Sequence, residues 1–131
     1  MVDRSPPRDL FVRYGLVPEV ARCQLVEGMN RPQRGERVVV ETHRGPQLGE
    51  VLGDVRSVTD ESTAFRVIRI AEERDLLAAR EILERSGREF SEWAGRIAEW
   101  KIDLQLIDME WTLDGEKLIL YVLNERGPEC T

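Results

Sequence analysis

The chain has 131 residues, of which 41% are hydrophobic, and this is enough for one domain with an apolar core of its own. Its formal net charge of −6 argues against a sequence-independent nucleic-acid binder, because such proteins depend on many Lys and Arg contacts to phosphate. The charge is uneven, since residues 1–45 carry eight Arg and six acidic residues, a net charge of +2. A local RNA contact by this first part of the chain therefore stays open.

The metal-ligating residue types are scarce. The sequence has two cysteines, Cys23 and Cys130, and a single histidine, His43, which excludes a structural zinc or iron–sulfur site assembled within one chain. No segment approaches the roughly 18 unbroken apolar residues of a membrane span, and the first residues lack the apolar stretch of a signal peptide. We therefore expect a cytoplasmic protein with reduced thiols, no metal and no cofactor.

The first half of the sequence has the pattern of a small β subdomain. Residues 1–8 contain Pro6-Pro7 and are expected to form a disordered arm. Over residues 9–56, apolar and polar residues alternate with period two and are interrupted by turn residues at short intervals. This predicts antiparallel strands at 10–14, 20–26, 37–41 and 48–55, the last two joined by the turn His43-Arg44-Gly45-Pro46. Loops this short favour a curled sheet or small barrel.

The second half, residues 64–123, has the pattern of a β-α-β-β unit followed by a tail at 124–131. A strand is predicted at 65–70, and a helix at 72–100 whose first turn is acidic, as suits the positive end of its dipole. Gly87, near the middle of this helix, predicts a kink or break, and the alternative is a helix that projects toward a partner. Strands at 104–111 and 117–123 flank Asp114-Gly115, which is a strong hairpin signal.

The order strand, helix, strand, strand matches the first four elements of a ferredoxin-like unit. The predicted fold is therefore α+β, with an antiparallel β subdomain followed by an incomplete ferredoxin-like unit that has one long helix. A sheet that lacks its last helix and edge strand leaves an apolar face and an open edge. We therefore expect the chain to self-associate by pairing of strand edges or exchange of helices.

Several short segments carry a family resemblance. Arg69-Ile70-Ala71, followed by Asp75, resembles the opening signature of the PSP-type (polymerase suppressor) C-terminal domain family, which includes the YaaT-like bacterial regulators. The hairpin signature of that family is matched by Leu104, Leu106, Asp108, Glu110, Asp114-Gly115, Lys117-Leu118 and Tyr121. The β segment that precedes this domain in YaaT-like proteins is matched by Gly35, Val38, Val40-Glu41-Thr42, Arg44-Gly45, Gly49 and Val51.

The resemblance implies a function as well as a fold. It implies a non-catalytic adaptor in RNA processing or gene-expression control, whose protein partners would be YlbF- and YmcA-like helical proteins and an endoribonuclease. Some relatives are associated with messenger RNA, so a direct RNA- or DNA-binding module is the alternative. The family's hairpin is followed by a further helix and strand, and YaaT-like proteins have a cysteine-rich tail. We expect this sequence to lack all three.

Two groups of residues are candidates for binding. Arg34, Arg37 and Arg44, the last beside Gly45, form a candidate nucleic-acid or anion contact, because the planar guanidinium group matches phosphate geometry. These arginines are equally typical of solubilising side chains around a hairpin turn.

The second group is aromatic. Phe90, Trp93 and Trp100 fall on one stripe of the predicted helix and Trp111 lies next to the hairpin turn, which indicates a candidate partner surface. Packing of the helix against the hairpin explains the same stripe, whereas Trp111 is harder to place inside.

Catalytic residues are not indicated. Asp108 and Glu110 alternate with apolar neighbours and share a face, as paired acid–base carboxylates would, but the solvent side of a half-buried strand explains them as well. His43 has the surroundings of a solvated turn residue. Since none of the common catalytic motifs occurs, we expect no enzymatic activity.

Overall fold

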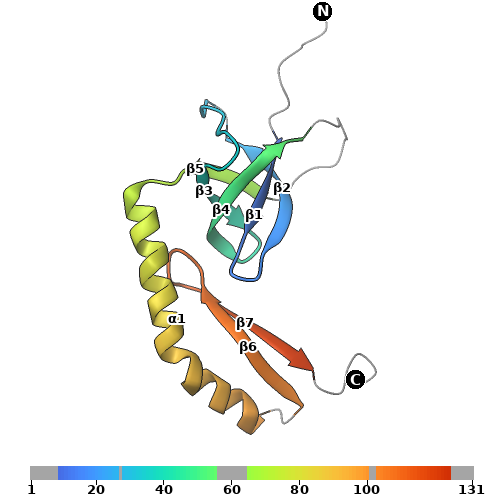
Figure 1. The fold of residues 1–131 in the computed structure, drawn as a ribbon, viewed down its shortest axis with the longest axis vertical. Coiled ribbons are helices and arrows are strands. Elements are labelled where there is room, and N and C mark those ends of the chain that lie inside the picture. Colours follow the sequence, from blue (N-terminus) through green and yellow to red (C-terminus); the bar gives the residue numbers. More distant parts are fainter. Residues whose placement is uncertain (1–8, 27, 56–64, 101–102, 125–131) are drawn as a thin grey trace, which may run out of the picture.

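The computed structural model describes residues 9–26, 28–55, 65–100 and 103–124. Within these ranges the chain forms a group of five strands, then one long helix, then a two-stranded hairpin (Figure 1). In chain order the elements are β1 (Asp9–Tyr14), β2 (Glu19–Leu25), β3 (Arg37–Thr42), β4 (Gly45–Asp54), β5 (Phe65–Ile70), α1 (Glu73–Trp100), β6 (Leu104–Trp111) and β7 (Leu118–Asn124).

The first five strands close into a barrel with the order β1-β2-β5-β3-β4, in which β4 pairs back onto β1. Strands β2 and β5 are parallel, and the other neighbouring pairs are antiparallel. The predicted barrel and its four N-terminal strands are confirmed. The largest difference in bounds is at β4, which begins at Gly45 because Thr42 and Gly45 already pair, so that only His43 and Arg44 form the turn.

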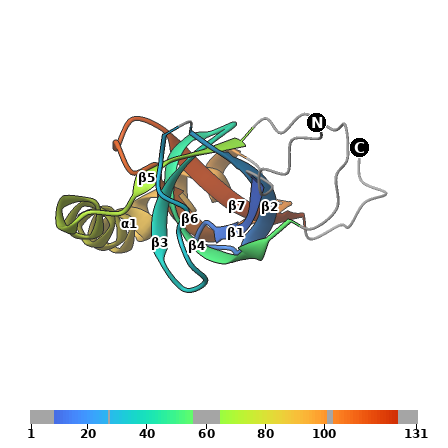
Figure 2. The ribbon, with the colours of Figure 1, turned by 90° about the horizontal axis from the view of Figure 1, so that it is seen from above.

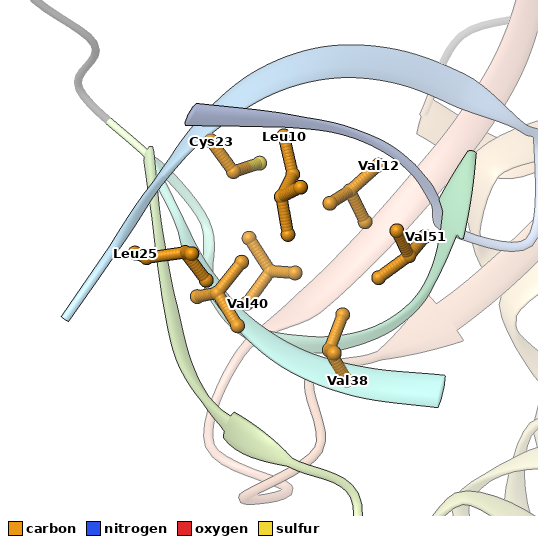
Figure 3. Packing of buried hydrophobic residues seen from close by; sticks show 8 residues of the cluster. Leu10, Val12, Cys23, Leu25, Val38, Val40 and Val51 are labelled. Atoms are coloured by element: carbon orange, nitrogen blue, oxygen red, sulfur yellow. The ribbon is translucent and has the colours of Figure 1, made fainter. Parts of the chain in front are cut away.

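The barrel interior holds the main apolar core. Along β1 every second side chain is buried, as period-two alternation requires of a strand with one face inside. Figure 3 shows side chains from β1, β2, β3 and β4 converging on the barrel axis. The buried cluster consists of Leu10, Val12, Cys23, Leu25, Val38, Val40, Val51 and Val67.

Strand β5 has a different position from the one expected of a ferredoxin-like unit. It was predicted to share a sheet with the hairpin, whereas it lies between β2 and β3, and β6 and β7 form a separate two-stranded sheet. The α+β class and the strand, helix, strand, strand order are confirmed, but the sheet pairing is not. The reason is that Val67 completes the barrel core, and the period-two pattern of β5 does not specify which sheet it joins.

The predicted long helix is confirmed as α1. Its start is fixed by Asp75, whose carboxylate accepts hydrogen bonds from the backbone N–H of Glu72 at 2.9 Å and from Arg69 at 2.6 and 3.0 Å. The helix passes through Gly87 without a break and curves along its length (Figure 1). Ser86 Oγ donates to the carbonyl of Ile82 at 2.8 Å, a contact that commonly bends helices.

The predicted hairpin is also confirmed. The β6–β7 turn is held by Thr112, whose hydroxyl donates to Asp114 at 2.6 Å and accepts from the N–H of Lys117 at 3.1 Å. Gly115 has a positive φ of 73°, which explains the Asp-Gly pair. Side chains of Leu106 and Met109 are buried between this sheet and α1. We call α1, β6 and β7 together the helix–hairpin lobe.

The lobe is attached to one end of the barrel. Viewed from above, α1 lies to one side of the barrel and β6–β7 passes beneath it (Figure 2). The N–H of Leu113, next to the hairpin turn, donates to the carbonyl of Pro46 at 2.7 Å. This bond joins the hairpin turn to the start of β4. No helix in the described ranges is long and apolar enough to cross a membrane.

Candidate functional site

The three candidate arginines lie in two places. Arg34 is exposed in the turn before β3, and Arg37 is exposed as the first residue of β3. Arg44 belongs to the turn after β3, at the opposite end of the strand. The fold therefore keeps Arg34 and Arg37 near each other and separates both from Arg44. Their contact with nucleic acid stays a prediction.

Arg44 faces the junction between barrel and lobe. Its Nη1 atom lies 3.6 Å from Glu19 Oε2, and its guanidinium carbon lies 5.9 Å from the ring centre of Tyr121. Nη1 is itself buried without a hydrogen bond. Arg44 thus contributes its charge to a partly exposed cluster between β2, the β3–β4 turn and β7.

Gly45 has a structural reason for its identity. Its φ of 130° lies in the region that side chains disfavour, and a Cβ there would lie 3.3 Å from Thr112 Cγ2. The residue therefore lets the β3–β4 turn approach the hairpin closely. This requirement accounts for Gly45 without any ligand.

Glu110 is the centre of the polar contacts between barrel and lobe. Its carboxylate accepts hydrogen bonds from the backbone N–H of Leu16 at 2.9 Å, from Gln47 Nε2 at 3.1 Å and from the hydroxyl of Tyr121 at 2.8 Å. Gln47 is fully buried and its Oε1 accepts from Thr42 Oγ1 at 2.8 Å. Gln47 was not identified from the sequence, and the only signal for it was a polar side chain at an inward position of β4.

Two tyrosines border this network. Burial, together with a hydrogen bond to Glu19, raises the pKa of Tyr14 to about 12. Burial and the hydrogen bond to Glu110 also raise the pKa of Tyr121. Both phenols therefore remain protonated donors at neutral pH, with Glu19 as the partner of Tyr14 and Glu110 as the acceptor for Tyr121. Asp108 instead accepts from the neighbouring N–H of Met109 at 2.9 Å, so the two carboxylates do not act together.

Trp111 fixes the hairpin to the helix. Its indole N–H donates to Glu89 Oε1 at 2.7 Å, and the guanidinium carbon of Arg85 lies 3.7 Å from its ring centre. Arg85 and Glu89 are themselves 3.4 Å apart. Trp111 is therefore half-buried in a contact between the hairpin and α1 and is not a freely exposed side chain.

The other aromatic candidates differ in exposure. Phe90 and Trp93 are half-buried on α1, and Arg96 lies 5.0 Å from the ring centre of Trp93. Trp100, the last residue of α1, is 63% exposed. The four predicted partner residues thus extend from an internal contact at Trp111 to a free surface at Trp100. Their role in partner binding stays a prediction.

Exposed apolar side chains occur at the end of the helix–hairpin lobe where α1 ends. Strand β6 begins four residues after Trp100, and Leu104 of β6 pairs with Asn124 of β7, so the end of α1 and the end of β7 adjoin. Leu123, 55% exposed, lies at this end of β7. We define the distal surface as the exposed side chains of Trp100, Ile107, Val122 and Leu123, of which Val122 and Leu123 point to opposite faces of the hairpin.

Metal ligation has no candidate in the part of the chain that the structure describes, where no three His, Cys, Asp or Glu side chains gather as ligands. Cys23 lies in the barrel core, and burial raises the pKa of its thiol to about 12. It therefore behaves as an apolar core residue.

Comparison with known proteins gives two matches. Residues 65–126 match the family described as the PSP1 C-terminal conserved region. The Stage 0 sporulation protein YaaT of Bacillus subtilis (strain 168) is 33% identical over 87 residues, which cover 64% of this chain and 32% of that protein. The chain thus spans about a third of the length of this curated relative. No solved structure matches.

The matched region begins with β5 and includes the whole helix–hairpin lobe. The resemblance found in the opening and hairpin signatures is therefore confirmed. Residues 65–126 of this chain are thus similar to the PSP1 C-terminal conserved region, and the chain is similar in sequence to YaaT.

Proposed function

We propose that the protein is a non-catalytic regulatory adaptor in a complex that acts in RNA processing or gene-expression control. The observation that supports this most directly is the distal surface, where large apolar side chains of the matched region are exposed. Trp100 is the most exposed of them, and Trp is enriched among the residues that dominate binding energy at protein interfaces. The similarity to a sporulation protein agrees with a regulatory role.

The partners we propose are helical proteins of the YlbF and YmcA kind together with an endoribonuclease, in the cytoplasm. The distal surface combines an exposed helix end with the outer edge of β7, and in the described ranges β7 pairs only with β6. A helix can pack on the first feature, and a strand can add to the second.

The test is a tagged pull-down from native lysate, with and without ribonuclease, followed by identification of the retained proteins. We expect helical partners or a ribonuclease to stay bound after RNA is digested, and a Trp100→Ser/Leu123→Ser variant to lose them. Val20→Ser is the matched control, because Val20 is 59% exposed but lies on β2 of the barrel. Retention by the distal variant would refute the proposal.

Direct nucleic-acid binding through Arg34, Arg37 and Arg44 is the alternative. It predicts that the retained set disappears on ribonuclease treatment and that binding weakens steeply with salt. Arg44→Glu would then abolish RNA retention and leave protein partners unaffected. The separation of Arg44 from the other two arginines counts against one continuous basic patch.

Self-association is a further proposal for the outer edge of β7. The segment 118–123 is apolar without interruption, a pattern typical of strands that are buried on both faces. Light scattering after size exclusion, over a range of protein concentrations, measures the mass. A monomer at micromolar concentration would rule the idea out.

A further inference from the structure

A small apolar hollow lies where the barrel meets the lobe. It has a volume of about 150 Å³ and lies between the β1–β2 turn, β4, the middle of α1 and β6. Leu16, Leu48, Leu83 and Met109 contribute apolar side chains to its wall. Leu83 is 58% exposed, so this wall is open to solvent. A cavity of about this size accommodates one benzene-sized group.

The polar groups in the wall of the hollow already have partners within the protein. Glu110 accepts the three hydrogen bonds described above, and Gln47 is bonded to Glu110 and Thr42. Ser86 donates to the carbonyl of Ile82. The hollow therefore suits an apolar side chain, because a polar occupant would find its potential partners engaged.

A second, charged hollow adjoins the first. Its volume is about 220 Å³, and Gly15 and Leu48 line both hollows. Arg13, Glu50 and Arg37 lie side by side here, since Glu50 of β4 pairs with Arg13 of β1 on one side and with Arg37 of β3 on the other.

Glu50 balances only one of its two arginine neighbours. Its carboxylate lies 3.1 Å from Arg13, whereas the guanidinium of Arg37 has no ion pair with any of the described residues. The second hollow is thus net positive on a chain whose formal charge is −6. An unpaired arginine beside an apolar hollow favours a ligand that carries an apolar group next to an anionic one.

We propose that the two hollows form one groove for a short acidic–apolar peptide of a partner protein. An aliphatic or aromatic side chain of the peptide enters the hollow beside Leu83, and an Asp or Glu carboxylate within a few residues of it pairs with Arg37. The groove shares no residue with the distal surface. This inference is therefore independent of the proposed adaptor contact there, and each can fail without the other.

The test selects random short peptides displayed on phage against the full chain. The enriched peptides are synthesised with a fluorescent label, and their affinity is measured by fluorescence anisotropy. We expect enrichment of an apolar residue close to Asp or Glu. We also expect the affinity to fall by at least about tenfold in Leu83→Asp and in Arg37→Glu, and to decrease with added salt.

Two matched variants serve as controls. Leu77→Asp changes a leucine of α1 that is 51% exposed and lies outside both hollows, and Arg34→Glu changes an exposed arginine in the preceding turn. Both controls should bind within about twofold of the parent protein. Thermal unfolding of all four variants checks that they are folded, which is expected because each substituted side chain is largely exposed.

Three results would overturn the proposal. One is the absence of any enriched peptide, and another is binding that Leu83→Asp leaves unchanged. The third is binding of a labelled single-stranded RNA that depends on Arg37 but not on Leu83, with no peptide selected. In that case the basic hollow would be a phosphate contact and the apolar hollow would have no part in it.

Discussion

The barrel and the helix–hairpin lobe are built from similar apolar alternation but differ in how completely they bury it. In the barrel, Leu10, Val12 and Cys23 have no exposed surface. In the lobe, Ile97, Leu106 and Met109 are buried, while Trp100 and Leu123 remain more than half exposed. A barrel has no free edges, whereas one helix on a two-stranded sheet covers only part of that sheet. The difference indicates that stability comes mainly from the barrel and that the lobe is available for contacts.

The largest loss of stability is expected from a substitution that removes a side chain from the barrel core. Leu10→Ala removes a fully buried side chain and leaves a cavity, so we expect the free energy of unfolding to fall by about 2–5 kcal/mol. Val20→Ala on β2, an exposed position, should change it by less than about 0.5 kcal/mol. Urea denaturation monitored by circular dichroism measures both. Equal effects of the two substitutions would contradict the assignment of the core.

The second largest loss of stability is expected from a substitution in the link between β5 and α1. Asp75→Asn weakens the ion pair with Arg69 and the capping bond to Glu72, so we expect a loss of about 1–3 kcal/mol. Chiefly through the hydrogen bond from Arg69, the pKa of Asp75 is lowered to about 2.

The lowered pKa of Asp75 makes this contribution dependent on pH. It is fully present above the unfolded-state pKa of about 4 and is lost as pH falls from there toward 2. We therefore expect the unfolding midpoints of the parent and of Asp75→Asn to differ at about pH 5 and to converge as the pH falls to about 2. A difference that persists unchanged at the acidic end would contradict this account.

The third largest loss of stability is expected from a substitution in the contact between the barrel and the helix–hairpin lobe. Glu110→Gln replaces a carboxylate that accepts three hydrogen bonds, and we expect a loss of about 1–2 kcal/mol. Hydrogen exchange should show faster opening at Leu16 and around the end of β6. Asp108→Asn is the control, because Asp108 bonds only its neighbouring N–H among the contacts shown by the structure. If both variants opened alike, Glu110 would not be the link between the regions.

The smallest effect is expected within the lobe. Trp111→Phe keeps an aromatic ring beside Arg85 but removes the N–H that donates to Glu89, so we expect a loss of about 0.5–1.5 kcal/mol. The midpoint of urea unfolding measures this loss. Because the lobe is the less buried region, a loss that equals that of Leu10→Ala would reverse the proposed order of the two regions.

The elements of the fold were largely predictable, and their pairing was less so. Gly115 after Asp114 specified the hairpin, and the acidic first turn marked the start of α1. The placement of β5 in the barrel was not predictable from its own six residues, because period-two alternation is the same in either sheet. Closure of the barrel depends on contacts between β2 and β5, which are far apart in the sequence.

The candidate sites show the same limit. The sequence identified Arg37 as a candidate anion contact and Trp100 as a candidate partner residue, with core packing as the alternative for Trp100, and the structure leaves both at the surface. It did not reveal that Arg44 faces Glu19 and Tyr121, since these residues come from three separate elements. The paired hollows beside Leu83 were likewise not predictable, because their walls come from both the barrel and the lobe.

By itself, the sequence determined the α+β class, the individual strands and helix, and the similarity of residues 65–126 to the PSP1 region, because these depend on local periodicity, turn chemistry and short signatures. The tertiary structure alone decided which strands pair, which charges are neutralised and where apolar side chains stay exposed. Those properties depend on contacts between residues that are distant along the chain. Which charged and exposed side chains are available for binding is therefore decided only when both regions are folded.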